Sequence, residues 1–114
     1  MAKDLLARIR KNREQKIAIG TFTFVLRRPT DAEMVELHRG NVGPAEVAQR
    51  FVIGWEGVTE NDVVGGGGSD PLVFDAALWR EWCGDRMDFW TPLAEAAFEA
   101  YRAHAETLEV AAKN

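Results

Sequence analysis

The segment Arg50–Val58 restricts the fold of this chain more than any other. It reads Arg-Phe-Val-Ile-Gly-Trp-Glu-Gly-Val, an apolar run that ends where two glycines flank a tryptophan, with no catalytic group beside it in sequence. Phe51 and Trp55 are four residues apart, which places them on one face of a helix that opens at Pro44. The two glycines favour the end of that helix and a sharp turn. We expect Trp55 to lock this turn, against the core first and a partner second.

The apolar period changes to two upstream of this segment. Phe22, Phe24 and Leu26 point one way in an extended chain, and the residues between them point the other way. Pro29 ends the run. The pattern predicts a small β element, a strand or a hairpin, around residues 17–27.

Capping signals and apolar spacing predict helices in the rest of the chain. Thr30 and Glu33 form a capping-box pattern, and Gly40 is suited to a left-handed end of the helix that follows. The expected helices are a basic N-terminal arm in residues 1–16 and the segments 30–40, 44–55, 75–82 and 91–112. The fold class expected is therefore α+β, predominantly helical, with four to five helices in one domain, 1–114.

Residues 59–71 are predicted to form a flexible loop, because they contain four consecutive glycines, Gly65–Gly68. A phosphate-binding loop would need a lysine after the glycines, but Ser69 and Asp70 follow them here. The glycine run is interpreted as a connector.

The charge is unevenly distributed. The net charge is −4, yet residues 1–16 hold six basic and two acidic groups, a balance of +4 that leaves −8 for the rest. An acidic body disfavours nucleic acid as the main partner. No apolar stretch reaches the ~18–20 residues that span a bilayer, and the N-terminus lacks the apolar core of a signal peptide. We expect an intracellular protein with no membrane partner.

Residues suited to catalysis do not cluster in the sequence. Cys83 is the sole cysteine, and the two histidines, His38 and His104, lie 66 positions apart. Metal-binding histidines are usually closer in sequence, for example four apart on a helix. Acids near the tryptophans superficially suggest a glycan site, but helix capping accounts for them. We expect neither an enzyme nor a cofactor or metal site.

Four tryptophans in 114 residues are the most distinctive feature of the composition. Each ring can bury ~150–250 Å², and aromatic residues dominate interface hot spots. Either all four lie in the core, or some also form a binding or oligomer surface. The candidate partner-binding residues are Phe51, Trp55, Trp79, Trp82, Trp90 and Tyr101.

The order of these segments resembles the tail assembly chaperones of long-tailed bacteriophages and prophages, across residues 22–114. In Phe24–Asp31 a strand ends in an Arg-Pro-Thr-Asp helix start, and Phe51–Val58 is similar to the family's Val-x-Gly-Trp-x-Gly-Val segment. Pro71–Asp75 then enters a Trp-bearing helix, and an Ala/Glu-rich helix ends the chain. The four-glycine insertion departs from the usual loop of the family.

The resemblance implies a non-enzymatic function. Such chaperones bind the helical tape measure protein and keep it soluble in the host cytoplasm until tail tube subunits polymerise around it. We expect this chain to self-associate and to be absent from the finished virion. A groove with Phe51, Trp55, Trp79 or Trp82 at its base would cover apolar helical faces of that partner. The alternative is another phage structural adaptor, such as a head–tail joining or tail terminator protein, which would remain in the virion.

The resemblance also implies a prediction about the gene. Many members of the family are made in two lengths through a ribosomal frameshift near the stop codon. Lys113-Asn114 is the pair that a slippery A-AAA-AAC run would encode. We expect sequencing of these codons to find that run, and an AAG-AAT pair would contradict the prediction.

Overall fold

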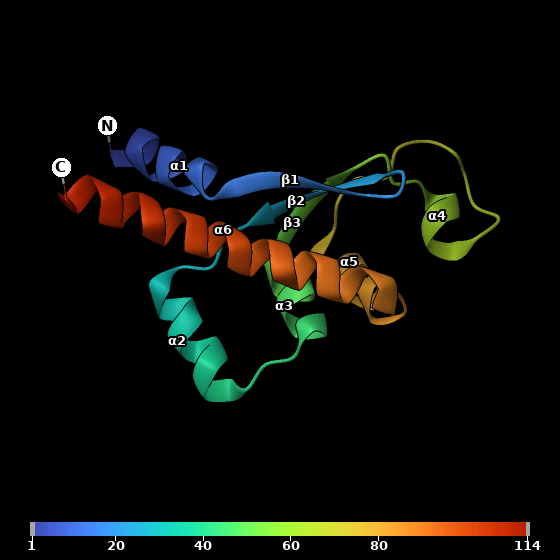
Figure 1. Ribbon diagram of the computed structural model, residues 1–114. Coiled ribbons are helices and arrows are strands. Elements are labelled where there is room, and N and C mark those ends of the chain that lie inside the picture. Colours follow the sequence, from blue (N-terminus) through green and yellow to red (C-terminus); the bar gives the residue numbers. More distant parts are fainter. Residues whose placement is uncertain (1, 114) are drawn as a thin grey trace.

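The computed structural model describes residues 2–113, which form six helices and a three-stranded antiparallel sheet (Figure 1). The α+β, mostly helical fold class is confirmed. The elements in chain order are α1 (Ala2–Asn12), β1 (Glu14–Ile19), β2 (Phe22–Arg27), α2 (Asp31–Gly40), α3 (Pro44–Phe51), β3 (Val52–Glu56), α4 (Glu60–Val64), α5 (Ala76–Gly84) and α6 (Met87–Lys113).

The predicted β element is a hairpin. β1 and β2 pair antiparallel, with Ile19 opposite Phe22, so Gly20 and Thr21 form the turn. Gly20 adopts a φ of 59°, a left-handed conformation that glycine adopts without steric cost. β1 begins at Glu14, three residues before the expected start. Its first residues, Glu14-Gln15-Lys16, are polar and carry no alternating pattern that would mark a strand.

The prediction that the helix from Pro44 continues through Trp55 is wrong. α3 ends at Phe51, and Val52–Glu56 is the edge strand β3, which pairs with β2 in the sheet order β1-β2-β3. Val52 and Ile53 are β-branched, so they fit a strand better than a helix. A bulge opposite Val25 and Leu26 leaves Ile53 without a pairing partner in the register, and Trp55 still reaches the core, opposite Phe24.

The helix caps follow the sequence closely. The capping box of Thr30 and Glu33 is present at the start of α2, and Asp75 accepts a hydrogen bond from the Leu78 amide at the start of α5. The left-handed residue after α2 is Asn41, at φ 50°, and not the expected Gly40. Asparagine tolerates this conformation better than most residues.

The segment 59–71 contains more structure than the predicted loop. Thr59 and Asp62 form a second capping box, which starts the single-turn helix α4. Gly65 and Gly66 adopt φ values of 70° and 76°, and a Cβ on Gly67 would lie 2.7 Å from Glu60 Cγ. The backbone conformation and the close contact therefore favour glycine at three of the four positions. The sequence analysis had explained the glycine run by flexibility alone.

The longest helix, α6, begins at Met87 and not at the expected Thr91. Pro92 lies inside it, so the Asp88 carbonyl has no amide at that position to bond to. Phe89 is fully buried in the first turn, and its packing holds the helix start upstream of the proline. Leu93 and Ala97 of α6 are buried, whereas the helix is exposed from residue 105 onward.

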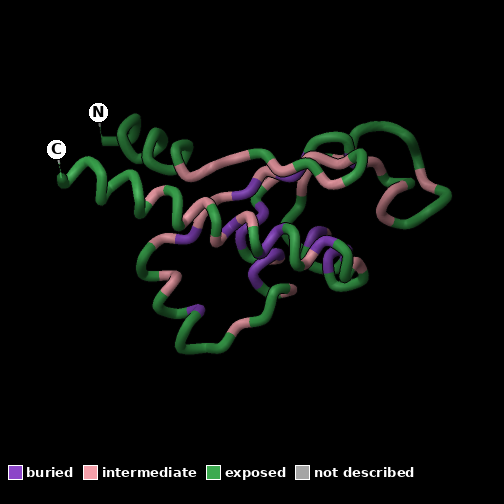
Figure 2. Tube along the Cα trace, viewed as in Figure 1, coloured by how far each residue is buried: buried purple, intermediate pink, exposed green. Residues whose placement is uncertain are grey.

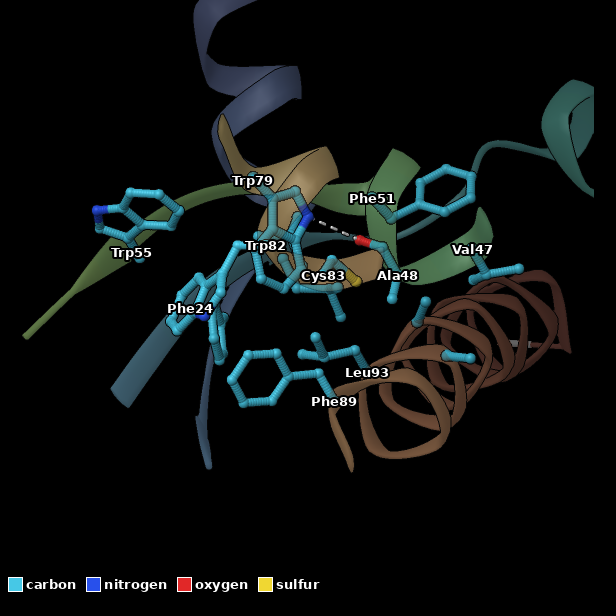
Figure 3. Close-up of a cluster of buried hydrophobic side chains, with 14 of the residues drawn as sticks. Phe24, Val47, Ala48, Phe51, Trp55, Trp79, Trp82, Cys83, Phe89 and Leu93 are labelled. Atoms are coloured by element: carbon cyan, nitrogen blue, oxygen red, sulfur yellow. Dashed lines mark hydrogen bonds between the residues drawn. The ribbon is translucent and has the colours of Figure 1, made fainter. Parts of the chain in front are cut away.

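The core lies between the sheet, α3, α5 and the first half of α6, and its purple segments occupy the centre of Figure 2. Aromatic rings fill much of it (Figure 3). Phe24 packs at ring-centroid distances of 5.0 Å from Trp79 and 5.1 Å from Phe89. The Trp79 indole N–H donates to the Ala48 carbonyl at 3.2 Å, which connects α5 to α3.

The core makes a stability prediction. Phe24→Ala removes a ring that is fully buried among other rings, so we expect the free energy of unfolding to fall by about 3–5 kcal/mol. Val73→Ala, at a site with 85% exposure, should change it by less than about 0.5 kcal/mol. Urea denaturation followed by tryptophan fluorescence measures both, and equal effects would contradict this description of the core.

Candidate partner-binding surface

Four of the six candidate partner-binding residues lie in the core. Phe51 and Trp79 are fully buried, and Trp55 and Trp82 expose 8% and 5% of their surface. A partner cannot reach these rings while the core is closed. The expected groove with these residues at its base is therefore absent from the described residues, because the rings pack against one another.

Trp55 locks its turn from inside the fold. Its indole N–H donates to the Leu72 carbonyl at 2.8 Å, and its ring meets Phe74 edge to face at 4.8 Å. The residues after the glycine run are thereby attached to β3. Trp55 acts on the core side, as expected first.

Trp90 and Tyr101 are the two candidates that reach the surface, and both are half-buried. The Trp90 N–H donates to the Cys83 carbonyl at 2.7 Å. Burial raises the pKa of the Cys83 thiol to about 11, so the thiolate needed for nucleophilic chemistry is disfavoured. Cys83, which is fully buried, therefore packs as a small apolar group.

Tyr101 lies in a groove between α2 and α6, here called the α2–α6 groove. The groove has a volume of about 520 Å³. Its lining residues are Met34, Leu37, His38, Asn41, Val42, Phe98, Tyr101 and Arg102. Four of these residues are apolar and four carry polar groups, a mixed composition that suits an amphipathic ligand.

A second hollow of about 510 Å³ lies beside the groove. Met34, His38 and Tyr101 line both hollows, and Val35, half exposed, lines the second one. Leu37 is the one buried residue of α2. α2 therefore contacts the body along a narrow line and leaves apolar surface on both sides.

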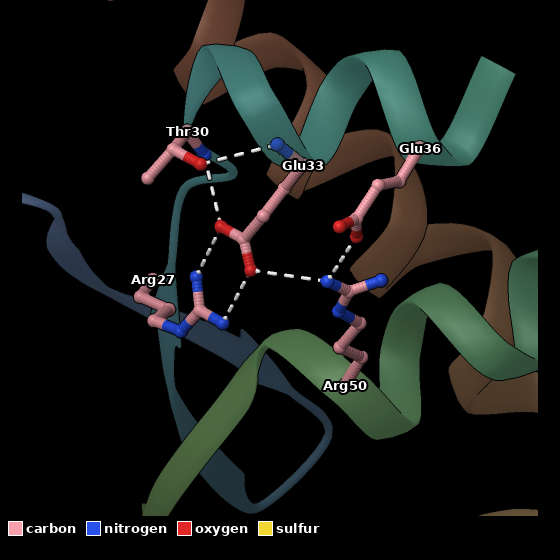
Figure 4. Close-up of polar contacts among 5 residues, drawn as sticks. All are labelled: Arg27, Thr30, Glu33, Glu36 and Arg50. Carbon is pink, nitrogen blue, oxygen red and sulfur yellow. Dashed lines mark hydrogen bonds and ion pairs between the residues drawn. The ribbon is translucent and has the colours of Figure 1, made fainter.

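Ionic contacts hold α2 where apolar packing is thin (Figure 4). Arg27 donates to both carboxylate oxygens of Glu33 at 2.8 Å. Arg50 donates to Glu36 at 2.8 Å and to Glu33 at 3.4 Å. The guanidinium groups of Arg27 and Arg50 also lie over the Phe51 ring, at 4.8 and 5.5 Å. The buried Phe51 thus supports the groove from below.

At its N-terminal end, α2 is held to α6 by a single side-chain hydrogen bond. The Tyr101 hydroxyl donates to an Asp31 carboxylate oxygen at 2.7 Å, linking α6 to the first turn of α2. This bond raises the pKa of the Tyr101 hydroxyl, because its ionisation would place two negative charges together. The arrangement positions α2 and offers no activated nucleophile.

Residues 2–113 hold no group of three or more His, Cys, Asp and Glu side chains that could bind a metal ion. Within the same residues, no helix is long and apolar enough to cross a membrane. Comparisons with protein-family models, with curated proteins and with solved structures found no match for this chain.

The sequence-based search for partner-binding residues missed most of this groove. Met34, Leu37, Val42 and Phe98 were not candidates, although all four lie in or just after a helix that the sequence predicted. The available signal was the apolar content of α2, which its neighbours leave partly uncovered. The aromatic residues were chosen as candidates because large rings are common in interfaces, but four of the six rings are buried in the core.

The network around Glu33 makes a pH prediction. Hydrogen bonds from Arg27 hold the pKa of Glu33 at about 2, below its ordinary value of 4.5. A carboxylate whose pKa is lowered by folding stabilises the fold above the unfolded pKa, and this stability is lost as pH falls toward the folded pKa. We expect Glu33 to contribute stability at pH 7 that declines between about pH 5 and pH 2.

Glu33→Gln should remove this part of the pH dependence and lower stability at pH 7. Glu36→Gln is the matched control, because Glu36 belongs to the same network but its side chain is 64% exposed. Thermal melts at pH 7 and at pH 3 measure the difference. An equal pH response in wild type and Glu33→Gln would contradict the role assigned to this carboxylate.

Proposed function

We propose that this chain is a phage tail assembly chaperone that binds the tape measure protein, and that the α2–α6 groove holds an apolar helix of that partner. The proposal includes self-association, work in the host cytoplasm and absence from the finished virion. It extends to contact with the tail tube protein when tube subunits replace the chaperone.

One observation carries the proposal. The α2–α6 groove is lined by both apolar and polar residues, in a chain that resembles this chaperone family over residues 22–114. A helix laid in such a groove buries its apolar face against Met34, Val42 and Phe98, the partly exposed apolar residues of the lining. His38, Asn41 and Arg102 lie where they can meet polar groups beside that face.

The attachment of α2 supports this use of the groove. A site for a long, variable helix must accept side chains of different sizes, and a helix held along a narrow line can shift to accept them. Met34 adds an unbranched side chain that adapts to irregular neighbours. The ionic anchors on Glu33 and Glu36 keep α2 attached while its apolar side moves.

A co-expression experiment tests the function. The tape measure protein of the same phage or prophage should appear in the soluble fraction with this chain and in the aggregate without it. Met34→Glu places a charge in the groove and should reduce the soluble fraction by about tenfold, since burying an unpaired charge is costly. Quantitative immunoblotting of the two fractions measures the effect.

Two variants serve as controls. Met34→Leu keeps the volume and apolar character of the wall, so it should behave as wild type. Val73→Glu adds the same charge at an exposed site that does not line the groove, and it should also solubilise the partner. Circular dichroism establishes that each variant is folded.

Failure of the wild type to solubilise the tape measure protein would reject the chaperone. Finding the chain in purified virions would favour the alternative, a structural adaptor. Solubilisation by Met34→Glu at the wild-type level would keep the chaperone but reject the groove as its binding site.

A further inference from the structure

Two apolar helical faces are uncovered at one end of the molecule. In Figure 1 the N- and C-termini lie at the same end, and Figure 2 colours both terminal helices as exposed there. Leu5, Leu6 and Ile9 of α1 are 57%, 47% and 43% exposed, and Leu108 of α6 is 57% exposed. The two helices therefore do not bury each other within one copy.

The face on α1 is apolar with basic edges. Leu5, Leu6 and Ile9 fall on one side of the helix, and no side chain within residues 2–12 is buried. Arg8 borders this side on one edge and Arg10 on the other. α1 holds four basic groups and one acid, a charge of +3, which leaves −7 for the rest of the chain.

The face on α6, here called the α6 tail, spans residues 105–113. Ala105, Leu108 and Ala112 share one side of the helix and continue the stripe that is buried farther upstream. Glu106 and Glu109 lie along one edge of it. Glu109 has an exposed partner in Lys113 at 3.3 Å, a contact of little energy.

We propose that this end of the molecule is a homodimer interface, in which α1 of one copy packs on the α6 tail of a second copy. Because both faces lie at the same end, one two-fold rotation covers both faces of both copies. The basic edges of α1 then meet Glu106 and Glu109 of the other copy. This interface is separate from the α2–α6 groove. It locates the self-association that the proposed function includes and rests on that part of it, and it can be tested without the tape measure protein.

The required area explains why both faces take part. A stable interface buries roughly 800 Å² on each partner. α1, with 11 residues, is about 16 Å long and is too short to supply this area alone. In a two-fold dimer, the contact between α1 and the α6 tail occurs twice, which doubles the buried surface. Isologous packing thus covers Leu5, Leu6 and Ile9 of α1 and Leu108 of the α6 tail in both copies.

The charges at this end favour a second copy of the chain over anionic lipid or nucleic acid, the other ligands that a basic amphipathic helix can bind. Anionic lipid or nucleic acid would attract Arg8 and Arg10 but would repel Glu106 and Glu109 beside them. A second copy offers the opposite charge to each of these groups. The molecule also carries −7 outside α1, so a copy of itself is an acidic partner.

Charge reversal tests the interface. We expect wild type to be a dimer in sedimentation equilibrium across the micromolar range. Arg8→Glu with Arg10→Glu makes both faces acidic, and Glu106→Arg with Glu109→Arg makes both basic. Each double variant should raise the dimer Kd by about tenfold or more. An equimolar mixture of the two double variants should restore the dimer, because each face then meets an opposite charge.

The controls separate the interface from general charge effects. Glu46→Arg with Glu95→Arg reverses two exposed acids elsewhere and should leave the dimer Kd unchanged. Leu5→Asp with Ile9→Asp should give a monomer that the mixing experiment does not rescue. Circular dichroism checks that each variant is folded.

Three results would overturn the proposal: a wild type that stays monomeric, a dimer that persists in both charge-reversed variants, or a mixture of the two that does not associate. Phosphatidylglycerol vesicles and a labelled DNA duplex serve as further probes. A wild type that is monomeric in solution but binds either probe through α1 would assign the surface to that ligand instead.

Discussion

The packing of Trp79 is the interaction on which the rest of the structure depends. Its ring is fully buried and lies 5.0 to 6.4 Å from the rings of Phe24, Trp55, Trp82 and Phe89, which belong to β2, β3, α5 and α6. Its N–H is bonded to α3, so the polar atom is buried without the ~1–3 kcal/mol cost of an unpaired donor. One side chain thus connects five elements.

This use of the aromatic residues determines which surface remains for binding. Once the large rings are packed together, the exposed apolar groups are mostly aliphatic, as in α1, α2 and the α6 tail. Phe51 connects the two regions, because Arg27 and Arg50 stack on it and hold the carboxylates of α2. The core therefore helps to position α2, and it contributes Leu37 to the lining of the groove.

The sequence predicted what local rules determine and missed what pairing partners determine. Thr30, Asp75 and the alternation of Phe22, Phe24 and Leu26 fixed their elements, since each signal acts within a few residues. β3 was mistaken for helix because Phe51 and Trp55 fit a helical period, while the strand is stabilised by β2, distant in sequence. The groove was missed for the same reason: its walls come from α2 and α6, and no local pattern shows which apolar side chains stay uncovered.

The elements outside the core share a physical property that bears on binding. α2 is attached by ion pairs and one buried leucine, α1 has no buried side chain, and the α6 tail extends beyond the packed half of its helix. Segments with few buried apolar contacts open at lower free energy than the core. Their exposed apolar faces stabilise the molecule little when it is alone and gain most when a partner covers them. Because the amphipathic helices are weakly attached to the aromatic core, they can shift or open without disturbing the packing of Trp79.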